Sequence, residues 1–151
     1  MKKIIIIFIL FVSSCGYQPI YVNKNTNALE FSQISIIGDV EINRKIINSL
    51  NIKKNSSSIL KKELILSSSY EINETSKNSK GQVVSYRSTI RVELKISENE
   101  KLISDKIFIQ DFTYANRDNK FDLVEYQTEV KNNLANEIIE DMILYMNLKW
   151  L

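Results

Sequence analysis

The chain of 151 residues contains no histidine, and this absence limits the chemistry that it can perform. Histidine is the commonest general base and the commonest metal ligand in proteins. Asp105, Asp111, Asp118 and Asp122 are scattered along the chain, without the paired spacing that general acid–base catalysis requires. A glycine-rich phosphate loop is also absent. The sequence therefore predicts a protein that is not an enzyme, with no metal site and no dissociable cofactor.

Cysteine, glycine and proline are scarce as well. The single cysteine excludes an intrachain disulfide and any zinc site of the Cys-Cys or Cys-His type. Three glycines and one proline exclude low-complexity linkers and collagen-like structure. The formal net charge of +2 is too small to predict nucleic-acid binding. With 44% hydrophobic and 25% charged residues, the composition is typical of one folded domain.

The amino terminus has the pattern of a secretory signal peptide. Two lysines precede an unbroken apolar run from Ile4 to Val12, and the small residues Ser13 and Ser14 follow. A basic segment, an apolar run of about 7–15 residues and a small-residue cleavage zone define such a peptide. The run is shorter than the roughly 20 residues that a membrane-spanning helix needs. Residues 1–14 are therefore predicted to be cleaved off, in preference to forming a short buried strand or core helix.

The lone thiol, Cys15, lies at the end of this segment. The stretch Val12 to Cys15 resembles a bacterial lipobox, although leucine is commoner than valine at its first position. The resemblance implies a diacylglycerol on the thiol and an N-acyl chain, such as palmitate, on the new amino terminus. Two or more chains anchor a protein stably, since each buried methylene contributes about 0.8 kcal/mol. The competing interpretation is a catalytic thiol, which needs the base that an absent histidine would supply.

Hydrophobic alternation predicts a sheet. A short strand is expected at 31–38, ended by Gly38, and three long strands at 63–75, 83–97 and 102–115. The first long strand places Leu64, Leu66, Ser68, Tyr70 and Ile72 on one face. The second long strand alternates most clearly, with one apolar face from Val84 to Ile96 and one polar face. Short turns between the long strands predict an antiparallel meander. The polar face of that strand carries Ser85, Arg87, Thr89, Arg91, Glu93 and Lys95.

Helical spacing predicts two helices. The first is expected over about Val40 to Asn51, with Asp39 as its N-cap, and the polar stretch 53–58 should follow it as a loop. The second is expected from Phe121 to about Leu148. The predicted fold is α+β: a two-layer β-α-β-β-β-α sandwich with a mostly antiparallel four-stranded sheet and both helices on one face. Residues 30–151 form this domain, and residues 15–29 the acylated cysteine and a tether.

Three stretches resemble the family of the LPS-assembly lipoprotein LptE, in combination with this order of elements. They are "CGY" at 15–17, "KGQVVSY" at 80–86, and the long terminal segment "FDLVEYQTEVKNNLANEIIEDMI" at 121–143. The resemblance implies a non-enzymatic lipoprotein that plugs the outer-membrane β-barrel LptD, helps that barrel to assemble, and assists lipopolysaccharide insertion. Because Gly16 rather than aspartate follows the cysteine, the expected location is the periplasmic side of the outer membrane.

The same resemblance assigns candidate sites. Lys77 and Lys80 in the predicted hairpin, with Arg117 and Lys120 before the last helix, are expected to contact lipopolysaccharide phosphates. Lys80 and Lys120 are hypothesised to act as a pair; each of the four could instead be an ordinary solubilising residue.

The polar sheet face could meet the barrel wall, which gives Arg87, Arg91 and Lys95 as candidate partner-facing residues. An ordinary solvent-exposed sheet face explains the same pattern. Two other functions compete with barrel plugging: an auxiliary lipoprotein of a lipid-transporting ABC system, and a purely structural envelope lipoprotein.

Overall fold

The computed structural model describes residues 28–56 and 61–150. The predicted signal peptide, Cys15 and most of the predicted tether lie outside these residues. The elements, in chain order, are β1 (Leu29–Phe31), β2 (Gln33–Gly38), α2 (Val40–Ser49), β3 (Ile52–Lys54), β4 (Lys62–Lys77), β5 (Val83–Glu98), β6 (Lys101–Ala115) and α3 (Lys120–Trp150).

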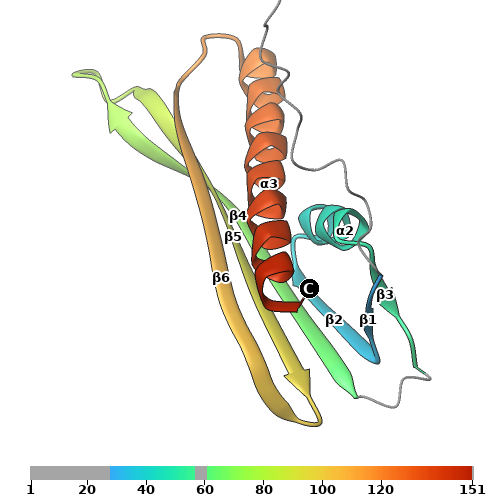
Figure 1. Cartoon of the computed structure of the whole chain (residues 1–151). Helices are drawn as coiled ribbons and strands as arrows, with labels where there is room; N and C mark the ends of the chain where they lie inside the picture. Colours follow the sequence, from blue (N-terminus) through green and yellow to red (C-terminus); the bar gives the residue numbers. More distant parts are fainter. Residues whose placement is uncertain (1–27, 57–60, 151) are drawn as a thin grey trace, which may run out of the picture.

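A four-stranded sheet in the order β2-β4-β5-β6 forms one layer of the domain. The strand β2 runs parallel to β4, whereas β4, β5 and β6 form an antiparallel meander. Both helices lie on one face of this sheet, with α3 across β5 and β6 and α2 beside β2 and β4 (Figure 1). This arrangement confirms the predicted α+β fold. No element of residues 28–56 and 61–150 covers the other face of the sheet, which is called the uncovered face.

A second, two-stranded sheet was not predicted. The strands β1 and β3 pair in parallel, so the expected single strand at 31–38 is interrupted at Ser32, and the expected polar loop begins with a strand. Ser32 leaves the line of the strand and donates through its N–H to the carbonyl of Lys62, 2.7 Å away. Phe31 and Ile52 are buried in the core. Burial of these two side chains accounts for the pairing of β1 with β3. The sequence did not predict it, because a strand of three residues is too short to show a periodic pattern.

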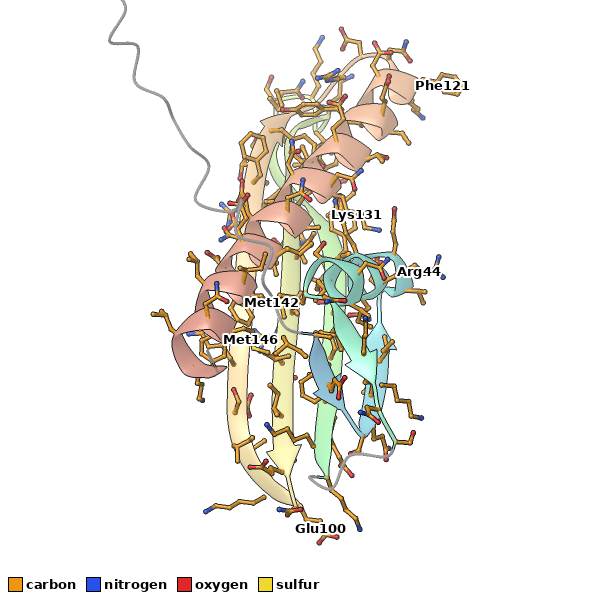
Figure 2. The ribbon with its side chains drawn as sticks, turned by 45° about the vertical axis from the view of Figure 1, so that its right-hand side comes forward. Arg44, Glu100, Phe121, Lys131, Met142 and Met146 are labelled. Carbon is orange, nitrogen blue, oxygen red and sulfur yellow. The ribbon has the colours of Figure 1, made fainter. Side chains whose placement is uncertain are left out.

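The core lies between the sheet and the helices. Ile138 and Met142 of α3 are completely buried, as are Ile42 and Ile46 of α2, against the apolar face of β4 and β5 (Figure 2). Burying one such side chain stabilises the fold by about 1.5–3 kcal/mol. The completely buried apolar side chains of the sheet include Leu64, Leu66, Ile90, Val92 and Leu94, all of which belong to the predicted apolar faces.

Two residues of those predicted apolar faces are not buried. Ile72 and Val84 remain 39% and 46% exposed. They lie toward the β4–β5 hairpin, which extends beyond the helices (Figure 1). Alternation therefore predicted the face correctly, but the covering helix does not reach this far.

The ends of the helices differ slightly from the predicted ones. Helix α2 ends at Ser49 rather than near Asn51, because Asn51 adopts a positive φ of 50° that a right-handed helix does not accommodate. Helix α3 begins at Lys120 and continues to Trp150, two residues beyond the expected end.

Lys131 links the two helices. Its Nζ lies 3.0 Å from Oδ2 of Asp39 and 2.7 Å from Oε2 of Glu41, at the amino end of α2. Asp39 is the N-cap that was predicted, and its Oδ1 accepts from the N–H groups of Glu41 and Ile42, both at 3.0 Å. Burial alone would raise the pKa of the Asp39 carboxyl, but the Ile42 N–H and Lys131 lower the pKa below its ordinary value of 3.8. The folded state therefore favours the ionised carboxyl.

This link predicts a pH dependence of stability. Because its folded pKa is lowered, the Asp39 carboxylate stabilises the protein above the ordinary pKa, and this contribution is lost as the pH falls through the lowered value. The free energy of unfolding, measured by urea denaturation, is expected to fall less between about pH 7 and about pH 2.5 in Lys131→Met than in the unaltered protein. Lys45→Met is the matched control, since Lys45 contacts Asn132 and not Asp39 or Glu41. Equal pH dependence of the two variants would contradict the assignment.

Candidate functional site

The β4–β5 hairpin presents the first two candidate cations. Its turn is fixed by Asn78, whose Oδ1 accepts from the N–H groups of Lys80 (2.9 Å) and Gln82 (3.0 Å), and by Gly81 with a φ of +76°. Lys77 closes β4 and forms an exposed ion pair with Glu74, with 2.9 Å between Nζ and Oε2. The turn therefore holds the backbone of Lys80 in place while its side chain extends into solvent.

The β6–α3 connection presents the other two candidate cations, Arg117 and Lys120. It is attached to the base of the hairpin by Asn116, which donates through its backbone N–H to the carbonyl of Val84 (2.7 Å) and through Nδ2 to that of Val83 (2.8 Å). The guanidinium of Arg117 lies 4.0 Å from the ring centroid of Tyr126, in cation–π contact. Lys120 is the first residue of α3 and is exposed.

Arg117 adjoins an aromatic cluster that the sequence did not reveal. Tyr114 is at its centre, with ring centroids 6.1 Å from Tyr86, 6.4 Å from Phe112 and 5.5 Å from Tyr126. The alternation of β5 and β6 places Tyr86, Phe112 and Tyr114 on the helix-facing side, and the sequence contains this part of the signal. The contact with Tyr126 depends on the position of α3 over the sheet, for which the sequence has no signal.

The four candidate phosphate contacts thus lie at one end of the domain, on two neighbouring connections (Figure 1). In the part of the chain that the structure describes, no contact joins Lys80 to Lys120, and the suggested pair remains a hypothesis. Lys77 and Arg117 already have partners, whereas both lysines of the suggested pair extend into solvent.

The three partner-facing candidates lie together on the uncovered face of β5. Arg87 donates to Oγ1 of Thr113 at 3.1 Å and lies 3.6 Å from Oδ2 of Asp111. Lys95 lies 2.8 Å from Oε1 of Glu93, and its hydrogen bond lowers the pKa of that carboxyl. Arg91 is exposed and has no ion-pair partner among residues 28–56 and 61–150.

Apolar side chains share this face with the charges. Cross-strand register places Ile109 beside Arg91, Ile107 beside Glu93 and Ile65 beside Lys95. All three isoleucines are exposed on the sheet surface. The uncovered face therefore combines ion pairs with exposed isoleucines, and it is less polar than the sequence of β5 alone indicates.

Two negative findings concern the described residues. No helix among them is both long enough and apolar enough to cross a membrane. No cluster of acidic residues or cysteine in this part of the chain has the arrangement of a metal site. Cys15, the predicted lipid-attachment residue, lies outside the described residues.

Comparisons with known proteins identify the fold. No family model and no curated protein matches the sequence. The structure is similar to that of the lipoprotein B from Nitrosomonas europaea, with 11% identity, a TM-score of 0.55, and coverage of 76% of this chain and 81% of that one. It is also similar to a minor lipoprotein from Acinetobacter baumannii, with 9% identity, a TM-score of 0.51, and coverage of 76% and 89%. At such identities the likeness establishes a shared fold.

Proposed function

We propose that this protein is a non-enzymatic lipoprotein of the outer membrane that plugs the LptD β-barrel, helps it to assemble, and assists lipopolysaccharide insertion into the outer leaflet. In this proposal the mature chain begins at Cys15, whose acyl chains hold it on the periplasmic side. The similar folds of two bacterial lipoproteins support the anchored part of the proposal.

The observation that carries the partner role is the broad sheet face that neither helix of the described residues covers (Figure 1). It presents Arg91 without an ion-pair partner in the described chain, beside the exposed Ile109. The interior of a large transmembrane barrel is polar, and a plug inside it needs a rigid domain with a mainly polar surface. Two neighbouring antiparallel strand pairs make this face rigid. This face, with its ion pairs and the exposed Arg91, is therefore the surface that we propose meets the barrel wall.

The basic side chains at the hairpin end of the domain support a role in handling lipopolysaccharide. Phosphates form strong, charge-assisted hydrogen bonds with lysine and arginine. Lys80 and Lys120 are exposed there, and Arg117 lies against the aromatic cluster around Tyr114. This combination offers cations for the phosphates beside apolar rings for the acylated part of the ligand.

Charge reversal tests this site. The double variant Lys80→Glu with Lys120→Glu is expected to weaken lipopolysaccharide binding by the full chain at least about tenfold, since each lost charge-assisted bond costs about 1.5–3 kcal/mol. The measurement is fluorescence anisotropy with labelled lipopolysaccharide. The matched control is Lys53→Glu with Lys54→Glu, which changes two exposed lysines on β3 by the same charge. Binding that is unchanged, or weakened equally by the control, would remove this site from the proposal.

Co-purification tests the partner. When the acylated full chain is captured from detergent-solubilised outer membranes, the LptD-type barrel is expected to be recovered with it. Recovery of an inner-membrane transporter complex instead would favour the auxiliary role in a lipid-transporting ABC system. Recovery of neither would favour a structural envelope lipoprotein.

A further inference from the structure

The outer edge of β6 offers a backbone surface that no other strand of the described chain occupies. The strand is 15 residues long and pairs only with β5 in residues 28–56 and 61–150. It contains no proline, and its single register irregularity lies at the far end, opposite Ile96 and Ser97. Long edges of this kind normally carry bulges, prolines, charged side chains or a covering element, because unpaired strand edges bind other strands. Of these, the middle of β6 has the charged side chains Asp105, Lys106 and Asp111.

The hydrogen-bond pattern shows which groups this edge presents. The N–H of Asn116 donates to the carbonyl of Val84, and the register of β6 with β5 is uninterrupted from Ser104 to Ala115. Antiparallel strands alternate between residues that bond to the neighbour and residues that do not. The odd-numbered residues from Asp105 to Thr113 therefore direct their N–H and C=O groups away from β5, toward solvent.

A groove runs beside this edge, between β6 and α3. Its volume is about 190 Å³. Phe112, Val130 and Leu134 supply its apolar lining, and Glu129 and Glu137 supply its carboxylates. Asp111 also borders the groove, but its carboxylate lies toward Arg87 on the opposite face of the sheet. Glu129 and Glu137 have no ion-pair partner in the described part of the chain. The groove therefore combines apolar surface with uncompensated negative charge.

We propose that this edge binds an extended segment of a partner protein in which apolar residues alternate with lysine or arginine. The backbone of that segment would pair with the odd-numbered residues of β6 and extend the sheet by one strand. Side chains alternate across a strand, so one set would rest on the groove, where basic residues meet Glu129 and Glu137. The other set would continue the uncovered face next to Ile107 and Ile109.

A second copy of this chain is disfavoured in the register centred on Phe108, the middle of β6. Antiparallel pairing of two β6 strands about Phe108 would place Asp105 of each copy directly opposite Asp111 of the other. Like charges that face each other across a strand pair are destabilising. A basic segment is favoured instead, because its positive charges attract the carboxylates of the groove.

A synthetic peptide of alternating valine and lysine tests the proposal, with the full chain in detergent micelles. It should bind and slow amide hydrogen exchange at Ile107, Ile109 and Asp111. The same peptide with glutamate in place of lysine, or with N-methyl groups on the paired backbone positions, should not bind. No binding of the lysine peptide, or equal binding of all three peptides, would overturn the proposal. So would a concentration-dependent dimer that protects these amides without peptide.

Two variants test the contributions of the backbone and of the charges to peptide binding separately. Ile109→Pro removes an outward N–H without removing a bond to β5, a position at which edge strands tolerate proline. The double variant Glu129→Lys with Glu137→Lys reverses the charge of the groove. Each should weaken binding of the lysine peptide at least about tenfold, the equivalent of one or two hydrogen bonds to charged or backbone groups.

The controls keep the edge intact. Ile109→Val retains the outward N–H and an apolar β-branched side chain, and Glu63→Lys with Glu71→Lys adds the same charge on β4, two strands away from the edge. Both should bind the lysine peptide within about twofold of the unaltered chain, because neither removes a contact of the pairing. Thermal unfolding followed by circular dichroism establishes that each variant is folded. Loss of binding in the controls to the same extent would overturn the proposal.

Discussion

Gly38→Ala is expected to lower the free energy of unfolding by about 2–5 kcal/mol. Gly38 has a φ of +89°, a left-handed conformation that costs other residues about 1–2 kcal/mol. A Cβ atom added there would lie 1.8 Å from the carbonyl oxygen of Ser68. That oxygen belongs to the backbone of β4 and cannot move aside as a flexible side chain would, so the forced shift adds about 1–3 kcal/mol.

The cost is large because Gly38 lies where three elements meet. It ends β2, and the next residue, Asp39, caps α2. The N–H of Asp39 donates to the carbonyl of Ser68 at 3.1 Å, and Oγ of Ser68 donates to the carbonyl of Asp39 at 3.1 Å. A displacement of Ser68 would therefore disturb the β2–β4 pairing and the helix cap together.

Gly81 provides the matched control. It has a similar φ of +76°, but an added Cβ would meet nothing within 4 Å. Gly81→Ala should therefore cost only the conformational part, about 1–2 kcal/mol. The measurement is urea denaturation of both variants. Equal destabilisation by the two substitutions would show that the contact with Ser68 does not determine the role of Gly38.

The second large effect concerns attachment to the membrane. Cys15→Ser is expected to abolish acylation and to remove the protein from the outer-membrane fraction. Each methylene of the lost acyl chains contributes about 0.8 kcal/mol to membrane binding, so the loss of two or more chains leaves no stable anchor. Sedimentation of membrane fractions and mass spectrometry of the amino-terminal peptide measure this result.

Ser14→Ala serves as the control for this substitution. It keeps a small residue immediately before Cys15, and the modified peptide should still begin at Cys15 with its acyl chains. An outer-membrane location that survives Cys15→Ser, or an amino-terminal peptide without lipid in the unaltered protein, would contradict the lipoprotein assignment.

The long elements could be predicted because their side chains repeat with the period of the structure. In β5, apolar residues at every second position from Ile90 to Ile96 correctly marked the buried face. In α3, Val130, Leu134 and Ile138 recur at helical spacing and are buried as expected. Such patterns depend only on local geometry, so they are visible without knowledge of the tertiary structure.

The structural features that the sequence did not predict depend on contacts between distant segments. The strand β1 forms because β3 lies beside it, although Phe31 and Ile52 are far apart in the sequence. The cation–π contact of Arg117 with Tyr126 and the groove beside β6 both depend on the position of α3. The exposure of Ile72 depends on where the helix ends relative to the hairpin, which no strand pattern contains.

Contact between the uncovered sheet face and the wall of an outer-membrane barrel is what the proposed partner role requires. Site-specific photo-crosslinking tests it most directly, with p-benzoylphenylalanine replacing Arg91 on that face or, as the control, Arg44 on the exposed side of α2 (Figure 2). Irradiation of cells is expected to link position 91, and not position 44, to an LptD-type barrel protein. A crosslink from position 91 to an inner-membrane transporter component, or the same barrel crosslink from both positions, would contradict the proposed contact.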